Sequence, residues 1–276
     1  MLPNAKTKLC GIIGNPVEHS MSPAMHNAAF EHLGVNYVYL AFCVSDVAGA
    51  IRGMRALNIR GLSVTVPHKL EVMPYLDEID PVAQQIGAVN TVVNDNGRLK
   101  GYNTDWTGFV RSLEVHTPIQ DKRVVILGAG GAARAIAFGI KQRGGKMTIL
   151  NRAEEIALAQ ALATEIACPC GELSQLEPVT EAEIVINATS VGMHPEVEKT
   201  IIETRHLRPE QIVYDVVYNP LETRFLREAK ARGCPVIPGY EMLLLQGVAQ
   251  FELWTGKPAP VDLMRTILKE RLLEKI

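Results

Sequence analysis

The sequence predicts an α/β protein with two domains. Strand-like apolar runs and helix-like amphipathic runs alternate almost throughout the chain, which is typical of parallel sheets covered by helices. The length of 276 residues suits two domains of ordinary size, and a hydrophobic content of 47% allows each of them a full core. A glycine-rich segment, Gly128–Ala133, directly follows a strong strand pattern and precedes a helix pattern, which indicates a parallel α/β unit.

The first domain is predicted to be an open α/β domain. Its expected strands are Leu9–Gly14, Tyr37–Val44 and Leu62–Val66, and its expected helices are Pro23–Leu33, Val47–Asn58 and a short helix after Pro67. Two further strands, Ala88–Asn94 and Leu99–Tyr102, flank Asp95-Asn96-Gly97, which is a hairpin-turn signal.

A helix over Thr107–Leu113 is expected to lead into a second unit that begins at Arg123. The expected strands of that unit are Val124–Leu127, Met147–Leu150, Ile184–Asn187, Ile212–Asp215 and Val236–Ile237. Its expected helices include Ala132–Arg143 and Glu155–Ile166.

Two apolar helical patterns, Met242–Trp254 and Val261–Glu274, close the chain. Because such apolar helices need a surface to cover, we expect them to return to the first domain. The predicted domains are therefore residues 1–107, completed by 242–276, and residues 108–241. We expect a cleft between the two.

The glycine-rich segment fits the pattern Gly-x-Gly-x-x-Gly/Ala of dinucleotide-binding units. Gly128 permits the tight turn, Gly130 lets the backbone approach a pyrophosphate, and Ala133 allows close packing of helix on strand. The N-terminus of the following helix, where Gly131 and Ala132 stand, offers N–H groups to phosphates. Glycines also make plain turns, but a strand before and a helix after favour a Rossmann-type domain.

The next strand ends at Asn151-Arg152, about 20 residues past the glycines, where an NAD enzyme usually carries an acid for the ribose 2′-hydroxyl. The Arg152 guanidinium can instead pair with the 2′-phosphate of NADP. The alternative is a solvated arginine at a strand end. Glu154 and Glu155 weaken the phosphate interpretation, although they are better explained as charges at a helix N-terminus.

Lys69 and Asp105 each follow a strand-like run and stand among small hydroxyl and amide residues. A lysine and an aspartate brought together in this way can move a proton. Beside a nicotinamide site, such a pair indicates reversible oxidation of an alcohol to a ketone. Taken singly, Lys69 could be a solvated lysine, and Asp105 could cap the helix that begins at Trp106.

Two hydroxyl residues, Ser20 and Ser22, precede the first helix. Ser22 followed by Pro23 is a good N-cap signal. Hydroxyls at a helix N-terminus also suit a carboxylate ligand, so we expect Ser22 to cap the helix and Ser20 to contact a ligand.

Composition excludes several classes of protein. A net charge of −2 gives no indication of a nucleic-acid or membrane partner, and no apolar stretch has the length of a membrane span. The N-terminal segment lacks the apolar run of a signal peptide, so we expect a cytoplasmic protein with its five cysteines reduced. Cys168-Pro-Cys170 stands without a second pair or a nearby histidine, and we expect no metal site.

Segments of the chain match a known family in order. They are residues 14–27, 63–69, 87–91, 101–105, 128–134, 151–152, 187–192, 215–220 and 239–246. On these segments the chain resembles the shikimate dehydrogenase family along nearly its whole length. The resemblance implies NADPH-dependent reduction of 3-dehydroshikimate to shikimate, a step of aromatic amino acid biosynthesis.

The resemblance also implies roles for individual residues. It marks Lys69 and Asp105 as the catalytic pair. The implied contacts of the substrate carboxylate are Ser20, Ser22 and Tyr218, and those of the ring hydroxyls or their neighbours are Thr65, Asn90 and Gln246. Gly239 and the segment Asn187–Met193, which contains Thr189, are implied to form the nicotinamide wall.

Three departures from the family pattern matter. Ser63 stands where asparagine is common, which could alter a contact with a ring hydroxyl. Ala153 replaces the threonine often found after Asn151-Arg152, and no second arginine follows in that turn, so NAD could be tolerated beside NADP.

The alternatives are a quinate/shikimate dehydrogenase that uses NAD and a non-catalytic metabolite sensor on the same fold. The intact pair of Lys69 and Asp105 argues against the sensor. We expect a small-molecule substrate and a monomer or homodimer.

Overall fold

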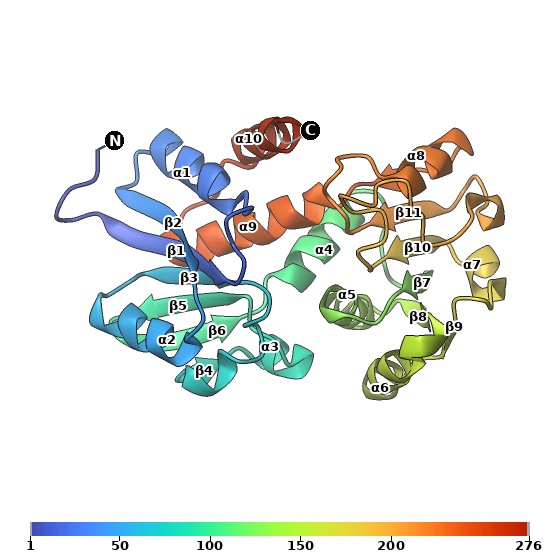
Figure 1. The fold of residues 1–276 in the computed structure, drawn as a ribbon, viewed down its shortest axis with the longest axis horizontal. Coiled ribbons are helices and arrows are strands. Elements are labelled where there is room, and N and C mark those ends of the chain that lie inside the picture. The colour runs from blue at the N-terminus through green and yellow to red at the C-terminus, as the bar shows by residue number, and fades with distance from the viewer. Residues whose placement is uncertain (1, 275–276) are drawn as a thin grey trace. The chain divides into compact units, whose positions relative to one another are not determined.

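A computed structural model of the protein describes residues 2–274 and divides them into two compact units (Figure 1). The first unit holds residues 2–104 and 246–274, and the second holds residues 105–245. The first contains a mixed six-stranded sheet and the second a wholly parallel, Rossmann-like six-stranded sheet. The predicted α/β fold class is confirmed.

The sheet of the first unit has the strand order β2-β1-β3-β5-β6-β4. Its strands are β1 (Lys8–Gly14), β2 (Tyr37–Cys43), β3 (Gly61–Val64), β4 (Glu78–Ile79), β5 (Thr91–Asp95) and β6 (Arg98–Tyr102). Strand β5 is antiparallel to β3 and β6, and the other neighbours are parallel. The predicted hairpin is confirmed, because Asn96 and Gly97 turn between β5 and β6 with φ angles of 54° and 91°.

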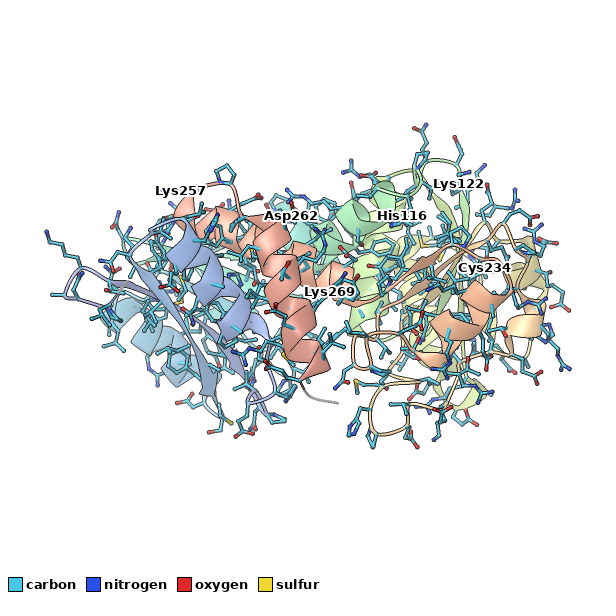
Figure 2. All side chains as sticks on the ribbon, turned by 90° about the horizontal axis from the view of Figure 1, so that it is seen from above. His116, Lys122, Cys234, Lys257, Asp262 and Lys269 are labelled. Carbon is cyan, nitrogen blue, oxygen red and sulfur yellow. The ribbon has the colours of Figure 1, made fainter. Side chains whose placement is uncertain are left out.

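Two layers of helices cover this sheet. The helices of the unit are α1 (Ser22–His32), α2 (Val47–Ala56), α3 (Pro81–Ile86), α9 (Tyr240–Thr255), which starts in the second unit, and α10 (Val261–Leu273). Because side chains alternate along a strand, Leu62 and Val64 of β3 pack in the core formed with α2, whereas Ser63 points to the opposite face. Helix α10 lies along α1, and Figure 2 shows Asp262 and Lys269 on α10.

An aromatic cluster holds α9 on the face opposite α2. Trp254 is 1% exposed, and its Nε1 donates to the carbonyl of Val92, 3.2 Å away. The His26 ring stacks on Tyr39 with a centroid separation of 4.6 Å. Burial lowers the pKa of His26 to about 3, so the cluster stays uncharged. At the end of α9, Arg60 Nε donates to the carbonyl of Trp254 at 2.9 Å.

The sheet of the second unit has the order β12-β11-β10-β7-β8-β9 and is parallel throughout. Its strands are β7 (Arg123–Leu127), β8 (Lys146–Asn151), β9 (Cys170–Glu172), β10 (Ile184–Asn187), β11 (Ile212–Asp215) and β12 (Val236–Ile237). Five of the six lie where strands were predicted. The three residues of β9 carry no apolar pattern, because this edge strand is exposed.

Helices cover both faces of the parallel sheet. They are α4 (Asp105–Glu114), α5 (Gly131–Gln142), α6 (Ile156–Ile166), α7 (Glu177–Glu181) and α8 (Arg224–Ala231). Phe109 of α4, Ile136 of α5 and Leu162 of α6 share one core, while Val179 of α7 and Phe225 of α8 share the other. His116 and Lys122 lie in the connection from α4 to β7, as Figure 2 shows.

The short helix expected after Pro67 is present as a 3-10 helix, Met73–Tyr75, which follows a series of turns. One local prediction was wrong. Ser22 is the first residue of α1, and Met21 holds the N-cap position without a side-chain hydrogen bond. Ser20 Oγ accepts the N–H of Ser22 at 3.3 Å, so the capping bond comes from the serine expected to be uncommitted.

The close approach of α9 to β3 makes a testable prediction. A Cβ at Gly61 would lie 2.1 Å from Trp254 Nε1 and 2.2 Å from Cδ1, and a buried ring cannot move aside. Gly61→Ala should therefore lower the free energy of unfolding by about 1–3 kcal/mol, as overpacking does. In the interior of α2, a Cβ at Gly53 would meet nothing within 4 Å. The matched Gly53→Ala should raise stability by about 0.5–1 kcal/mol. Urea titration measures both, and equal effects would contradict the account of Trp254.

Candidate functional site

Most polar side chains predicted for the first unit gather at one edge of its sheet. Ser20 and Ser22 follow the end of β1, Thr65 and Lys69 follow β3, Asn90 precedes β5, and Asp105 follows β6 by way of Asn103 and Thr104. Parallel β1 and β3 end at the same edge, and the antiparallel hairpin brings the start of β5 and the end of β6 there. Ligands of open α/β sheets bind at such an edge.

The loop that carries Lys69 is fixed on both sides of that residue. His68 is 3% exposed, and its Nε2 lies 2.8 Å from the carbonyl oxygen of Val44 while its Nδ1 lies 3.0 Å from Glu71 Oε2. The N–H of Val89 donates to the carbonyl of Lys69 at 2.8 Å, which joins this loop to the residue before Asn90. The Lys69 side chain is itself half-buried.

Thr65 is held beside the end of β1. Its N–H donates to the carbonyl of Ile13 at 2.9 Å, and a Cβ at Gly14 would lie 2.4 Å from Thr65 Cγ2. Glycine at position 14 therefore lets the half-buried threonine stand close to the strand. The backbone links continue to Asn90, whose carbonyl accepts the N–H of Val64 at 2.8 Å.

Asn90 is the most constrained polar side chain at this edge, at 2% exposed. Its Oδ1 accepts the N–H of Thr104 and the hydroxyl of Thr91, each at 2.7 Å. Asp105 directly follows Thr104 as the first residue of α4 and is half-buried. Gln246 lies on α9 and is 8% exposed.

The glycine-rich turn of the second unit has the geometry of a phosphate cradle. Gly128 has a φ of +108°, a conformation that only glycine adopts easily, and a Cβ there would lie 2.5 Å from Thr189 Cγ2. Gly130 is the N-cap of α5 and Gly131 its first residue. Both are exposed, and a Cβ at either would meet nothing within 4 Å. The half-buried Ala132 follows them.

This helix N-terminus fits a pyrophosphate. It has no side-chain cap, and the space outside Gly130 and Gly131 is open, so the N–H groups of the first turn of α5 can bind an anion. Ala133 is fully buried against the sheet, as the pattern predicts.

The two residues predicted for the ribose site differ in exposure, because Asn151 is buried and Arg152 is exposed. Asn151 ends β8, is 3% exposed, and donates from Nδ2 to the carbonyl of Glu155 at 2.9 Å, so its amide supports the following turn. Arg152 is exposed, and its Nη2 lies 2.5 Å from Glu155 Oε1. Glu155 therefore pairs with Arg152, a contact that its interpretation as a helix-end charge did not include. This hydrogen bond raises the pKa of Arg152 and lowers that of Glu155.

Sequence reasoning missed a buried network at the ends of β10 and β11. Asp215 is fully buried, and its Oδ1 accepts from Asn187 Nδ2 at 2.9 Å and from the N–H of Val217 at 3.0 Å. Asn187 Oδ1 in turn accepts from the Thr189 hydroxyl at 2.7 Å. The available signal was a polar residue at the last position of each of two apolar strands, Asn187 in β10 and Asp215 in β11. The network fixes the half-buried Thr189 at the carboxyl edge of the parallel sheet.

Two further predicted residues lie at the same edge of the second unit. Gly239 is buried before α9, and a Cβ there would lie 2.3 Å from the carbonyl oxygen of Val216, so no other residue fits. Tyr218 follows β11 and is half-buried. Burial raises the pKa of Tyr218, which keeps its phenol a neutral hydrogen-bond donor.

In residues 2–274, no group of three or more His, Cys, Asp or Glu side chains is placed to hold a metal ion. No helix of the described chain has the length and apolar character that crossing a membrane requires.

The parallel sheet, its glycine cradle and the polar strand-end residues define a dinucleotide-binding oxidoreductase of the Rossmann class. Three family models match the chain. They are the shikimate dehydrogenase substrate binding domain over residues 12–92, shikimate/quinate 5-dehydrogenase over 112–216, and the shikimate 5′-dehydrogenase C-terminal domain over 239–269. The chain belongs to the shikimate dehydrogenase family.

Similar proteins span the whole chain. Shikimate dehydrogenase (NADP+) of Moorella thermoacetica is 52% identical over 279 residues, which cover 97% of this chain and 95% of the relative. A crystal structure of a shikimate dehydrogenase in complex with NADP+ is 44% identical, covers 100% of this chain and 98% of its own, and has a TM-score of 0.92. The Listeria monocytogenes enzyme, solved with shikimate and NAD, is 43% identical with coverage of 96% and 98% and a TM-score of 0.91.

Asp215 generates a prediction about pH. Burial raises the pKa of Asp215 from 3.8 to about 6, so the folded protein binds more protons than the unfolded chain between these values. The contribution of Asp215 to stability is therefore present below pH 3.8 and lost as the pH rises to 6. Relative to Asp215→Asn, wild-type protein should lose up to about 3 kcal/mol of unfolding free energy over this range.

Chemical denaturation at several pH values measures this difference. Asparagine retains an acceptor for Asn187 and Val217, whereas Asp215→Leu removes the acceptor of Asn187, Val217 and Thr223 and should cost about 1–3 kcal/mol for each lost hydrogen bond. If the unfolding free energies of wild type and Asp215→Asn differ by the same amount at every pH from 4 to 7, the pKa of Asp215 is not raised in the folded protein.

Proposed function

We propose that the protein catalyses the reversible NADPH-dependent reduction of 3-dehydroshikimate to shikimate. Membership of the shikimate dehydrogenase family supports this activity. The observation that carries the proposal is the grouping of Thr65, Lys69 and Asn90 at one sheet edge, in a chain whose parallel sheet carries a dinucleotide cradle. We further propose that the first unit binds the substrate and the second the cofactor.

In the proposed mechanism Lys69 and Asp105 form the catalytic pair. The bound cofactor supplies the hydride that reduces the ketone carbon. Lys69 delivers a proton to the ketone oxygen, and Asp105 orients the ammonium group and accepts from it. The anchoring of His68 and of the Lys69 carbonyl supports this role, because a proton donor must be held within hydrogen-bond reach of the reacting oxygen.

The proposed substrate contacts are donors suited to an anion and to hydroxyls. Ser20, Ser22 and Tyr218 bind the carboxylate, and Thr65, Asn90 and Gln246 bind the ring hydroxyls or their neighbours. The Ser20 oxygen accepts a backbone N–H, so its own hydrogen can point to the ligand. A neutral Tyr218 phenol likewise donates to a carboxylate.

For the cofactor we propose that the backbone at Gly128, Gly130, Gly131 and Ala132 holds the pyrophosphate and that Thr189 and Gly239 line the nicotinamide site. Asn151 shapes the turn that presents Arg152 to the 2′-phosphate. Because no second arginine follows in this turn, the preference for NADP should be moderate, and the exposed ion pair with Glu155 lowers it slightly further.

The alternative activity is that of a quinate/shikimate dehydrogenase using NAD. A family model that covers both substrates and a relative solved with NAD keep it open. The other alternative is a sensor that binds the metabolite without turning it over. A spectrophotometric assay that crosses shikimate and quinate with NADP and NAD separates all three. Turnover of quinate with NAD alone, or no turnover with any pair, would overturn the proposal.

We also propose a cytosolic enzyme that is a monomer or homodimer. All five cysteines are unpaired in the structure, which suits a reducing compartment.

The role of Lys69 is tested by its replacement. Lys69→Ala should lower kcat by about 100-fold or more, since a positioned acid–base group contributes that much, with a far smaller change in shikimate Kd. Leu70→Ala is the matched control, because Leu70 occupies the same loop and is 67% exposed. Retention of near-normal kcat by Lys69→Ala would remove the lysine from the mechanism.

The cofactor preference is tested by replacing each member of the ion pair between Arg152 and Glu155 in turn. Arg152→Ala should reduce the NADP/NAD ratio of kcat/KM by about 10- to 150-fold, the value of a charge-assisted contact. Glu155→Gln should raise the same ratio by about two- to fivefold, because it releases Arg152 from an exposed pair. Glu154→Gln serves as control, since Arg152 hydrogen-bonds only Glu155 of these two acids. A ratio that neither Arg152→Ala nor Glu155→Gln moves would mean that Arg152 is only a solvated strand-end residue.

A further inference from the structure

We infer that Thr91 and Gln250 are positioning residues that set the orientation of the Asn90 amide through a directed chain of hydrogen bonds. The inference rests on the proposed function, in which Asn90 contacts the substrate. It assigns the chemical role of Asn90, which is to donate from Nδ2 to a substrate oxygen.

This series of hydrogen bonds crosses the buried face of the mixed sheet. It runs from Tyr39 on β2 to Asn90, at the sheet edge where the proposed substrate contacts lie. Tyr39 Oη donates to Ser63 Oγ at 2.6 Å, and Ser63 Oγ donates to Gln250 Oε1 at 2.8 Å. Gln250 Nε2 then donates to Thr91 Oγ1 at 2.9 Å, and Thr91 Oγ1 donates to Asn90 Oδ1 at 2.7 Å. All five side chains are at most 4% exposed, so water does not compete for these bonds.

The direction of the chain follows from the number of hydrogens on each group. An amide nitrogen only donates, so Gln250 Nε2 occupies an acceptor site of the Thr91 oxygen. The single Thr91 hydrogen then points to Asn90 Oδ1, whose distance of 2.7 Å is shorter than the 3.2 Å to Thr104 Oγ1. Each group in the series therefore donates to the next one, from Tyr39 at the start to Asn90 at the end.

A second contact fixes the same orientation independently. The backbone N–H of Thr104 can only donate, and the Asn90 atom 2.7 Å from it must be the oxygen. With Oδ1 held by the Thr91 hydroxyl and the Thr104 N–H, the other atom of the amide is the nitrogen, which donates one hydrogen to Thr104 Oγ1 at 3.1 Å. A flipped amide would place the Asn90 NH2 group against the N–H of Thr104 and against the O–H of Thr91, and such donor–donor contacts are strongly unfavourable in a buried site.

Helix α9 carries Gln250, whose Nε2 donates to the Thr91 hydroxyl that in turn holds Asn90. Gln250 stands four residues after Gln246, so both side chains lie on one face of the helix. One helix face therefore provides a proposed substrate contact and the residue that orients another. Ser63, which could have altered a ring-hydroxyl contact, instead links Tyr39 to Gln250 in the interior.

The test removes one hydroxyl and keeps the volume. Thr91→Val should raise the shikimate KM about fivefold or more, because Asn90 loses a donor that fixes its amide. The NADP KM should stay within about twofold of the wild-type value. Thr91→Ser retains the hydroxyl and should restore the shikimate KM to within about twofold of wild type.

A control separates positioning from loss of stability. Ser112→Ala removes an equally buried hydroxyl, 3% exposed, that bonds Tyr214 Oη in the second unit at 2.7 Å. It should lower the melting temperature as Thr91→Val does and leave the shikimate KM unchanged. If Thr91→Val does not fold, Gln250→Glu replaces it, since a carboxylate at that position accepts from Thr91 and turns its hydrogen away from Asn90. The same rise in shikimate KM is expected.

A shikimate KM within twofold of wild type in Thr91→Val, an equal rise in the NADP KM, or failure of Thr91→Ser to rescue would overturn the inference. Absence of shikimate turnover by the wild-type protein would instead refute the proposed function, so the two failures are distinguishable.

Discussion

Helix α9 rests on the mixed sheet through Trp254, whose ring occupies the space beside Gly61 where any side chain would stand. That contact fixes the rotation of α9 about its own axis and its distance from the mixed sheet. Gln250 and Gln246 precede Trp254 at intervals of four residues and therefore lie along the same face. The hydrogen bond from Trp254 Nε1 to Val92 fixes the ring against β5, the strand that begins with Thr91. The geometry around Asn90 thus depends on how one indole packs.

Both units hold their functional edges with buried polar side chains. In the first, Asn90 accepts donors from the neighbouring strand end at Thr104. In the second, Asp215 accepts from Asn187 and from the backbone of Val217. Such groups cost free energy when buried, and they are tolerated because each acceptor meets several donors. The result is a set of loops whose positions are fixed by bonds that water cannot replace.

In the proposed cofactor site, the residue assigned to the phosphate already has an anionic partner. Arg152 forms an ion pair with Glu155, which lies three residues later. A 2′-phosphate would therefore displace or share that carboxylate. Since the pair is exposed, its strength is small, and the arginine keeps most of its value for an anion. In the proposed function, the choice between NADP and NAD therefore depends on the balance between the charges of Arg152 and Glu155.

The sequence by itself determined the fold class, the glycine cradle and the family. Alternating strand and helix patterns and the conformation required at Gly128 are local properties, which a linear pattern records. It also placed Lys69, Asn90 and Asp105 at strand ends, though their catalytic and binding roles remain proposals.

Only the tertiary structure decided the partners of the buried polar groups. Ser63 and Gln250 are 187 residues apart, and no periodicity links them. Ser22 became a helical residue because Ser20 accepts its N–H. Asp215 became a buried anchor because Asn187 at the end of β10 donates to it, as do Val217 and Thr223 of the segment that follows β11. Hydrogen bonds between distant segments depend on how sheets and helices pack, which the chain specifies only as a whole.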